Sequence, residues 1–281
     1  MNSNVSKRFT MRVVPVLLLS SLGAMTGYAQ RPAPMTEWYY ADGTIQPDGI
    51  NPKEAREGVW SPAREWMVVF NLSQQEAVAT ARFYFEDIAP REYQQKLPAR
   101  SPGRIVVHEL PEIVPPKKLY AVRVRCETPV VVQPTRAEYE PWNPVSHAMA
   151  SFVAYPGPLG KRETRWIYAD GLTLSSGNPL EEWEWISILN PDEHREAKVK
   201  ITFNFAGEQK VHDITVPAER VRSVDMYNLP IIPKNKISGP IIESDIPIVV
   251  EQVRRAYTKG IPVITALWAT LAYPVGDTDI H

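Results

Sequence analysis

The residues of this chain whose side chains could bind a ligand or take part in a reaction occur as two matched sets. The first set joins an aromatic residue, two carboxylates and a guanidinium: Trp38, Asp42, Glu65 and Arg136. The second set repeats these types in the same order: Trp166, Asp170, Glu184 and Arg254. An arginine presents a fixed fork of N–H donors to a carboxylate, and an aromatic ring beside polar groups can hold the apolar face of a sugar. Each set could therefore bind a small polar ligand, such as a sugar or a sugar acid.

The same residues also have a structural interpretation. In a strand, alternate side chains share a face, so Trp38, Tyr40 and Asp42 point one way and Tyr39 and Ala41 the other. The aromatic residues could then belong to the core, and the Asp-Gly pair could be a turn. The arginines could form internal salt bridges that pin two strands together. Sequence alone leaves the salt bridge and the ligand site both open.

A long internal repeat explains why the sets match. Trp38 is matched by Trp166, 128 positions later, and Pro129 by Pro247, 118 positions later. The change of offset indicates an insertion in the first copy, near residues 51–61. A period this long means tandem domains, because each unit is large enough to bury its own core. We predict domains over residues 30–157 (copy one) and 158–281 (copy two), joined by a short Pro- and Gly-rich linker.

Residues 1–29 have the layout of a secretory signal peptide. Three basic residues lead into an apolar run over residues 13–25, and small residues precede Gln30. The run is too short to span a bilayer, and no cysteine follows it to accept a lipid. We therefore expect cleavage near Ala29, no transmembrane anchor, and a periplasmic or secreted product.

The composition narrows the range of partners. Without the first 29 residues the chain has 28 Lys and Arg against 32 Asp and Glu, and no basic run is clustered. Nucleic acid is therefore not an expected partner, since its binding requires a concentrated basic face. Cys126 is the only cysteine, so no intramolecular disulfide can form, and its alternating apolar neighbours predict a buried thiol.

Short segments of alternating hydrophobicity dominate both copies and predict β-strands. In copy one these segments are residues 66–70, 78–85, 105–107, 120–126 and 130–132. In copy two they are residues 185–189, 199–205, 221–226, 237–242 and 248–253. No segment has a sustained helical period with caps. We predict an all-β protein of two tandem antiparallel β-sandwich domains of similar fold, with a partly open barrel as the alternative.

Catalytic chemistry has little support in the sequence. The five histidines show neither metal-ligand spacing nor recurrence between the copies. No nucleophile elbow or phosphate loop is present. Asp42 and Glu65 could form the carboxylate pair of a glycosidase, but small β-sandwiches bind sugars more often than they cut them. We expect no catalytic residues, no metal and no cofactor.

Copy two resembles the sensory rhodopsin transducer family. The resemblance rests on Trp-Ile-Tyr-Ala-Asp-Gly at residues 166–171, Thr-Val-Pro-Ala at residues 215–218, residues 244–250 and Arg254. It covers residues 165–275, and more weakly residues 37–157. The family implies a small β-sandwich that assembles into oligomers and has been proposed to bind small molecules, including sugars. Its name-giving member works inside the cell on a photoreceptor, so the export signal argues against light signalling by that route.

These observations predict a non-enzymatic, extracytoplasmic binding protein for a small polar ligand, a sugar or sugar acid. In this interpretation Arg254 orients the ligand and Trp166 stacks on it. The alternative is an interaction or scaffold protein, a homo-oligomer in which exposed strand edges build a larger assembly. Glycoside hydrolysis is the least favoured of the three.

Overall fold

A computed structural model of the chain describes residues 35–45, 63–140, 143–172, 180–258 and 264–275. The expected signal peptide and the insertion near residues 51–61 lie outside these ranges. Within them the regular structure is strands and two 3₁₀ turns, η1 (Val107–Glu109) and η2 (Lys161–Thr164). No helix in the described ranges is long and apolar enough to cross a membrane. The all-β prediction is confirmed.

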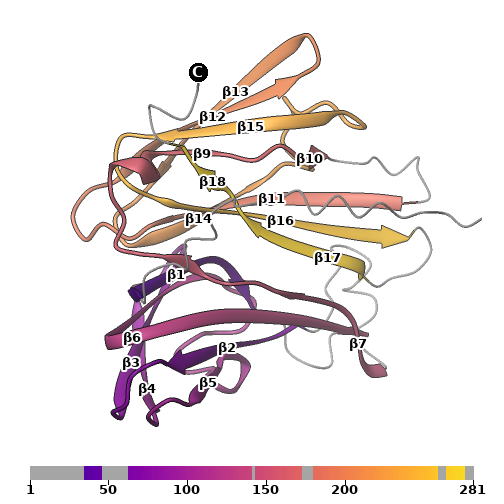
Figure 1. Cartoon of the computed structure of the whole chain (residues 1–281). Helices are drawn as coiled ribbons and strands as arrows, with labels where there is room; N and C mark the ends of the chain where they lie inside the picture. Colours follow the sequence, from indigo (N-terminus) through magenta and orange to yellow (C-terminus); the bar gives the residue numbers. More distant parts are fainter. Residues whose placement is uncertain (1–34, 46–62, 141–142, 173–179, 259–263, 276–281) are drawn as a thin grey trace, which may run out of the picture. The chain divides into compact units, whose positions relative to one another are not determined.

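Copy one forms two layers that share one long strand (Figure 1). The first layer has the order β4-β3-β6-β1-β8, and the second contains β5, β2, β6 and β7. Strand bounds are β1 (Met35–Thr44), β2 (Ala63–Asn71), β3 (Ala77–Phe85), β4 (Arg91–Leu97), β5 (Pro102–Val106), β6 (Leu119–Glu140), β7 (Asn143–Ser151) and β8 (Tyr155–Pro156). Every pairing is antiparallel.

Copy two repeats this plan as two separate sheets (Figure 1). One has the order β13-β12-β15-β9-β18, with β10 beside β15, and the other has the order β14-β11-β16-β17. Strand bounds are β9 (Arg165–Ile167), β10 (Gly171–Leu172), β11 (Leu180–Asn190), β12 (Ala197–Phe205), β13 (Glu208–Val216), β14 (Arg220–Asp225), β15 (Ile237–Ser244), β16 (Val249–Thr258), β17 (Ile264–Leu271) and β18 (Tyr273–Pro274).

The two copies share the same strand register. Trp38 pairs with Val124 and Pro156, and Trp166 pairs with the corresponding Ile242 and Pro274. The one large difference lies at the corner between the layers. Copy one continues through it as the 22-residue β6, whereas copy two breaks into β15 and β16. The expected separation of residues 120–126 from 130–132 is therefore wrong for copy one, which keeps its ladder through this corner.

Each copy buries its own apolar core between its two layers. In copy one the core joins Trp38 and Phe83 of the first layer to Met67 and Val69 of the second. In copy two it joins Trp166 and Phe203 to Ile186 and Ile188 in the same way. Cys126 lies in the first core, as its alternating neighbours predict. Facing apolar layers of this kind define β-sandwiches, which confirms the predicted fold class.

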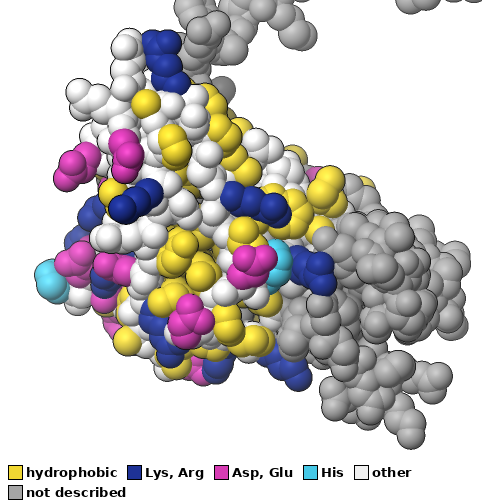
Figure 2. Space-filling model, turned by 90° about the horizontal axis from the view of Figure 1, so that it is seen from below, with side chains coloured by type: hydrophobic (Ala, Val, Ile, Leu, Met, Phe, Trp, Pro, Cys, Tyr) yellow, Lys and Arg dark blue, Asp and Glu magenta, His cyan; other side chains and the backbone are white. Residues whose placement is uncertain are grey.

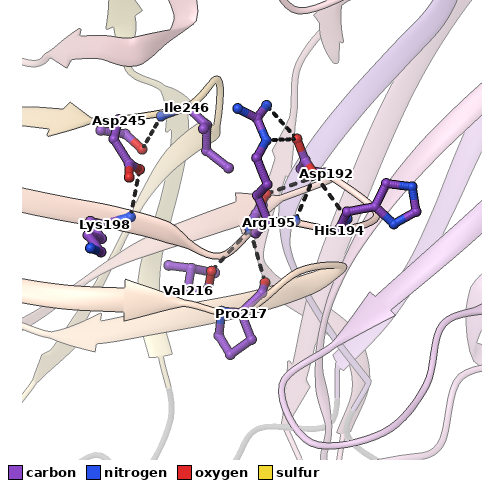
Figure 3. Close-up of polar contacts among 10 residues, drawn as sticks. Asp192, His194, Arg195, Lys198, Val216, Pro217, Asp245 and Ile246 are labelled. Atoms are coloured by element: carbon purple, nitrogen blue, oxygen red, sulfur yellow. Dashed lines mark hydrogen bonds and ion pairs between the residues drawn. The ribbon is translucent and has the colours of Figure 1, made fainter.

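A matched asparagine closes the first tight loop of each copy. The Nδ2 group of Asn190 donates to the carbonyls of Arg195, Val216 and Pro217 at 2.8, 3.0 and 3.1 Å. Figure 3 labels the three acceptor residues. Asn71 in copy one makes the same three kinds of contact and is equally buried. Buried amides satisfied in this way hold the predicted turns after β2 and β11 to the neighbouring loop.

A third apolar cluster joins the copies to each other. Its fully buried members from copy one are Tyr39, Ala41, Tyr84 and Ala121, and those from copy two are Leu189, Val221 and Val249. Residues 39 and 41 belong to this cluster while residues 38 and 40 belong to the core of copy one. The predicted alternation along β1 is thereby confirmed. Copy one contributes the outer face of its β1–β3–β6 layer, and copy two contributes the outer face of its β11–β14–β16 sheet.

Candidate functional site

Both matched tryptophans lie in the cores. Trp38 is 1% exposed and Trp166 is 0% exposed. The indole Nε1 of Trp38 donates to the carbonyl of Val130 at 2.8 Å, and that of Trp166 donates to the carbonyl of Glu163 at 2.8 Å. The expectation that Trp166 stacks on a ligand disagrees with this burial, because neither ring offers a face to solvent. Their role in the structure is to fill the core while their N–H groups are satisfied.

The charged residues of copy one do come together, at the ends of β1, β2 and β6. Arg136 Nη1 lies 3.4 Å from Glu65 Oε1 and 3.7 Å from Asp42 Oδ2. Arg136 Nε lies 2.8 Å from Oε1 of Glu138, a residue that the sequence analysis did not select. All four side chains are buried, so this set forms an internal ion-pair network.

Glu65 is the most constrained carboxylate of that network. Its Oε1 accepts a 2.9 Å hydrogen bond from the backbone N–H of Thr44, and Tyr120 OH donates to its Oε2. Burial raises the pKa of Glu65 to about 7, although the charge of Arg136 and these hydrogen bonds act in the opposite direction. Desolvation therefore outweighs the favourable contacts of the ionised form.

The corresponding residues of copy two also meet. Arg254 Nη1 lies 3.3 Å from Asp170 Oδ2, and Arg254 Nη2 lies 3.5 Å from Glu184 Oε2. Glu182, two positions before Glu184 on β11, lies 3.8 Å from Nη1. Backbone contact adds to these ion pairs, since Nη2 also donates to the carbonyl of Asp170.

Glu184 occupies the same structural position as Glu65. Its Oε2 accepts a 2.6 Å hydrogen bond from the backbone N–H of Leu172, and its Oε1 accepts a 2.6 Å bond from Gln252 Nε2. Burial raises the pKa of Glu184 to about 7, again against the effect of the neighbouring arginine. The two copies thus share a buried glutamate that binds the backbone of the preceding strand.

Exposure separates the two sets. Asp42 is 7% exposed, whereas the side chain of Asp170 is 77% exposed. Arg254 and Asp170 line a pocket of 590 Å³, together with Glu182, Gln252, Met149, Ala150, Ser151, Ala269 and Thr270. Strands β7 and β17 lie side by side here, so both copies contribute to its wall. The site is largely covered in copy one, where Asp42 borders a pocket of 340 Å³, and more open in copy two.

Copy two itself covers the site of copy one. Glu251 Oε2 accepts hydrogen bonds from the backbone N–H groups of Ala41 and Asp42 at 2.9 and 3.2 Å. Ser187 Oγ donates to Asp42 Oδ1. Arg255 Nε lies 3.2 Å from Glu138 Oε1. Strand β1 has an irregular register between Tyr40 and Gly43, so the N–H groups of Ala41 and Asp42 are directed to Glu251 at this bulge.

The strand period explains which residues the sequence analysis missed. Glu138 follows Arg136 by two positions, and Gln252 precedes Arg254 by two, so each shares a strand face with its arginine. A search for polar residues two positions from each arginine would have found Glu138 and Gln252. Glu251 and Arg255 occupy the opposite face of β16 and contact copy one instead. No local pattern marks Ser187, because its partner Asp42 is 145 positions away.

Titratable side chains do not form a metal site in the described part of the chain. No group of three or more His, Cys, Asp or Glu residues there has a geometry that could hold a metal ion. The carboxylates of both sets are instead paired with guanidinium groups.

The fold and the two sets define a class: tandem β-sandwich domains, each with an arginine held among carboxylates at the end of its central strands. The family model for the Anabaena sensory rhodopsin transducer matches residues 35–156 and 160–274. The chain therefore belongs to the Anabaena sensory rhodopsin transducer family and contains its domain twice. This confirms the resemblance and the tandem duplication inferred from the repeat.

Solved structures resemble either a part of the chain or, at very low identity, most of it. No curated protein matches it. A solved structure of Thermotoga maritima protein 1070 is 24% identical, covers 40% of this chain and 97% of its own, and has a TM-score of 0.34. The Anabaena sensory rhodopsin transducer is 24% identical over 36% of this chain and 86% of its own, with a TM-score of 0.30. A Bacteroides uniformis beta-glucuronidase is 6% identical over 85% of this chain and 31% of its own, with a TM-score of 0.18.

Proposed function

We propose that the chain is a non-enzymatic binding protein that acts outside the cytoplasm and holds a small polar ligand in the pocket at Arg254. The observation that carries this proposal is the contrast between the copies. Around Arg136 the charged residues are buried under copy two, and of these Asp42 borders a 340 Å³ pocket, whereas Arg254, Asp170 and Glu182 border a pocket of 590 Å³. A volume of this size falls within the range of small-molecule sites.

The pocket contains unsatisfied polar atoms of both kinds. Among the described residues, Arg254 Nε and Glu182 Oε2 are buried without a hydrogen-bond partner. A buried polar atom left unpaired costs roughly 1–3 kcal/mol. Both atoms are closed to solvent, as are Arg136 Nε and Glu138 Oε1 in copy one, so a ligand would reach them only if these side chains moved.

A sugar matches this chemistry because each hydroxyl can both donate and accept. Arg254 supplies donors, Asp170 and Glu182 supply acceptors, and the hydroxyls of Ser151 and Thr270 can do either. The two carboxylates favour a neutral sugar over a sugar acid, since a ligand carboxylate would meet both of them. Met149, Ala150 and Ala269 supply the apolar surface among the described lining residues, in place of the tryptophan expected from the sequence.

Two other expectations enter the proposal from sequence. The signal-peptide pattern of residues 1–29 supports export to the periplasm or beyond. Glycoside hydrolysis loses support, because Asp42 and Glu65 are buried and bound to Arg136.

The test is calorimetric titration of the protein with a panel of neutral sugars and sugar acids. Asp170→Asn is the diagnostic variant, because its exposed side chain can lose its charge with little effect on folding. We expect a neutral sugar to bind the parent protein and to bind Asp170→Asn at least tenfold more weakly. Arg195→Ala is the matched control, since it removes an exposed guanidinium whose ion-pair partner among the described residues is Asp192, at 2.7 Å. Unchanged affinity in Asp170→Asn, or loss in the control, would count against the site.

A further inference from the structure

Two arginines lie side by side on the outer face of the first layer of copy one. Arg82 of β3 pairs with Arg123 of β6, so both side chains leave the sheet on the same side. Tyr84 follows Arg82 by two positions on that face, and its ring belongs to the apolar cluster between the copies. Like charges directly opposite each other destabilise a sheet, so this pair needs negative charge nearby.

Carboxylates compensate one of the two arginines. Nη1 of Arg82 lies 2.7 Å from Oε1 of Glu92, and Nη2 pairs with Glu219 of copy two. In the part of the chain that the structure describes, the ion pairs of these strands do not include Arg123. The second arginine therefore has no carboxylate of its own among these residues.

Exposure decides how costly such a guanidinium is. On the face of the molecule seen from below in Figure 2, Lys and Arg side chains are interspersed with Asp and Glu at the surface, where water solvates them. Arg123 is 7% exposed, so water reaches little of it. A buried charge is strongly destabilising unless a counter-charge pairs with it.

Three hydrogen-bond donors lie close together here. Among the described residues, Arg82 Nε, Arg123 Nε and Tyr84 Oη are buried and make no hydrogen bond. The Cζ atom of each arginine lies 5.8 Å from the centroid of the Tyr84 ring. Burial raises the pKa of Tyr84 to about 12, although both arginines act in the opposite direction, so the hydroxyl keeps its proton at neutral pH. Three donors beside an uncompensated positive charge match an anion.

Copy two shows that the fold does not require these residues. Arg82 is replaced there by Thr202. The partner of Thr202 on β15 is Ile241, which stands in the place of Arg123. Asn204 replaces the tyrosine and donates to a backbone carbonyl at 2.8 Å. The positive set is therefore a feature of copy one alone, on the face that contacts copy two.

We propose that a small monovalent anion, with the size and charge of chloride, binds between Arg82, Arg123 and Tyr84. It accepts hydrogen bonds from the three donors and neutralises Arg123. Glu219 limits the site to one negative charge, since it already pairs with Arg82 and repels a second charge. Because Arg82 and Tyr84 both contact copy two, the bound anion stabilises the contact between the copies. This site is independent of the ligand proposed for the pocket at Arg254.

Thermal unfolding in chloride at constant ionic strength tests the proposal. Sodium gluconate replaces sodium chloride, because its anion is too large for a buried site. Binding to the folded state raises the melting temperature by mass action, and we expect a rise of roughly 3–6 °C for each tenfold increase in chloride above its dissociation constant. Equal melting temperatures in the two salts would overturn the proposal.

Variants locate the effect. Arg123→Ile introduces the side chain that copy two has at this position and should abolish the difference between the salts. Tyr84→Phe should weaken the apparent affinity for chloride, whereas Glu219→Gln removes the competing carboxylate and should strengthen it. Arg222→Ala is the matched control, since Arg222 also pairs across the copies, with Glu86, but is not one of the three donors. A chloride effect that survives Arg123→Ile, or that disappears in Arg222→Ala, would overturn the site.

Crystals grown in sodium bromide give a measurement that does not depend on how the variants fold. Bromide replaces chloride and scatters anomalously, so we expect an anomalous peak within hydrogen-bond distance of Arg123 Nε and Tyr84 Oη. A water molecule at this position, without anomalous signal, would overturn the proposal. A bromide peak without any chloride dependence in solution would mean an adventitious ion only, and would overturn it as well.

Discussion

The carboxylate of Glu251 accepts a 2.9 Å hydrogen bond from the backbone N–H of Ala41, 210 positions earlier in the chain. This bond joins the central strand of one copy to a bulge in the other, and Glu251 is fully buried. Burial, together with the charge of Asp42, raises the pKa of Glu251 well above its ordinary value. The contact between the copies is therefore made by a carboxyl group whose ionised form is disfavoured.

Substitution of Glu251 should separate the roles of its oxygen and its charge. Glu251→Ala leaves two buried N–H groups without an acceptor, and we expect a loss of roughly 2–5 kcal/mol in the free energy of unfolding. Glu251→Gln keeps the acceptor and removes the charge, so it should cost less than about 1 kcal/mol at pH 8. Urea unfolding of both variants measures the difference. Equal losses would show that the charge, and not the acceptor, makes the contact.

Stability should fall as the pH rises from about 5 to about 8. Glu65 and Glu184 have a pKa of about 7 in the folded protein, against 4.5 for an ordinary glutamate. Between these values the folded state binds more protons than the unfolded state, so raising the pH favours unfolding, by up to about 3 kcal/mol per group. The pKa of Asp192 is lowered to about 2, so its contribution is lost only below about pH 4 and does not interfere.

The control for this pH dependence is Glu184→Gln, which cannot ionise. Its stability, measured by urea unfolding at several pH values, should decline less steeply than that of the parent protein over the same interval. Parallel profiles for the two proteins would mean that Glu184 is ionised at neutral pH in the folded state.

The two arginines should differ in their effect on stability. Arg136→Met leaves the buried carboxylates of Asp42 and Glu65 without their cation, while Glu138 keeps Arg255, and we expect a loss of about 3–5 kcal/mol. Arg254→Met should cost less than half as much, because Asp170 is exposed to water. Thermal or urea unfolding compares them directly. Similar losses would indicate that the copy-two set is as much a structural ion pair as the copy-one set.

The matched asparagines provide a test of the loops. Asn190→Ala leaves three carbonyls and one N–H group without this side chain, and we expect a loss of about 2–4 kcal/mol. Asn71→Ala should cost a similar amount. Asp192→Asn, on the exposed side of the same loop, should cost less than about 1 kcal/mol. A small loss at Asn190 would show that water replaces the amide.

Sequence predicted what recurs between the copies and missed what differs. The repeat selected Asp170, Glu184 and Arg254, and strand alternation predicted that Tyr39 and Trp38 face opposite sides. Alternation does not say which face is covered, so it could not decide that both faces of β1 are buried. Asp42 and Asp170 follow the same residues in sequence, yet their exposure differs because the cover over Asp42 comes from β11 and β16.

The edge strands β4 and β13 are among the strands that escaped prediction. Their side chains alternate between half-buried and exposed, and most are polar, so the hydrophobic period is weak there. Tertiary pairing with β3 and β12 makes them strands. At the edge of a sheet, pairing with the neighbouring strand can override a weak intrinsic strand propensity.

The unbroken β6 gives copy one a mechanical property that copy two lacks. Its 22 residues carry one hydrogen-bonded ladder from one layer into the other, so sliding the layers past each other would break ladder bonds. In copy two the backbone leaves the ladder between β15 and β16, and the layers are separate sheets. Shear between layers therefore costs less in copy two. Copy two is therefore the more deformable copy, and its strands β11, β16 and β17 line the open pocket.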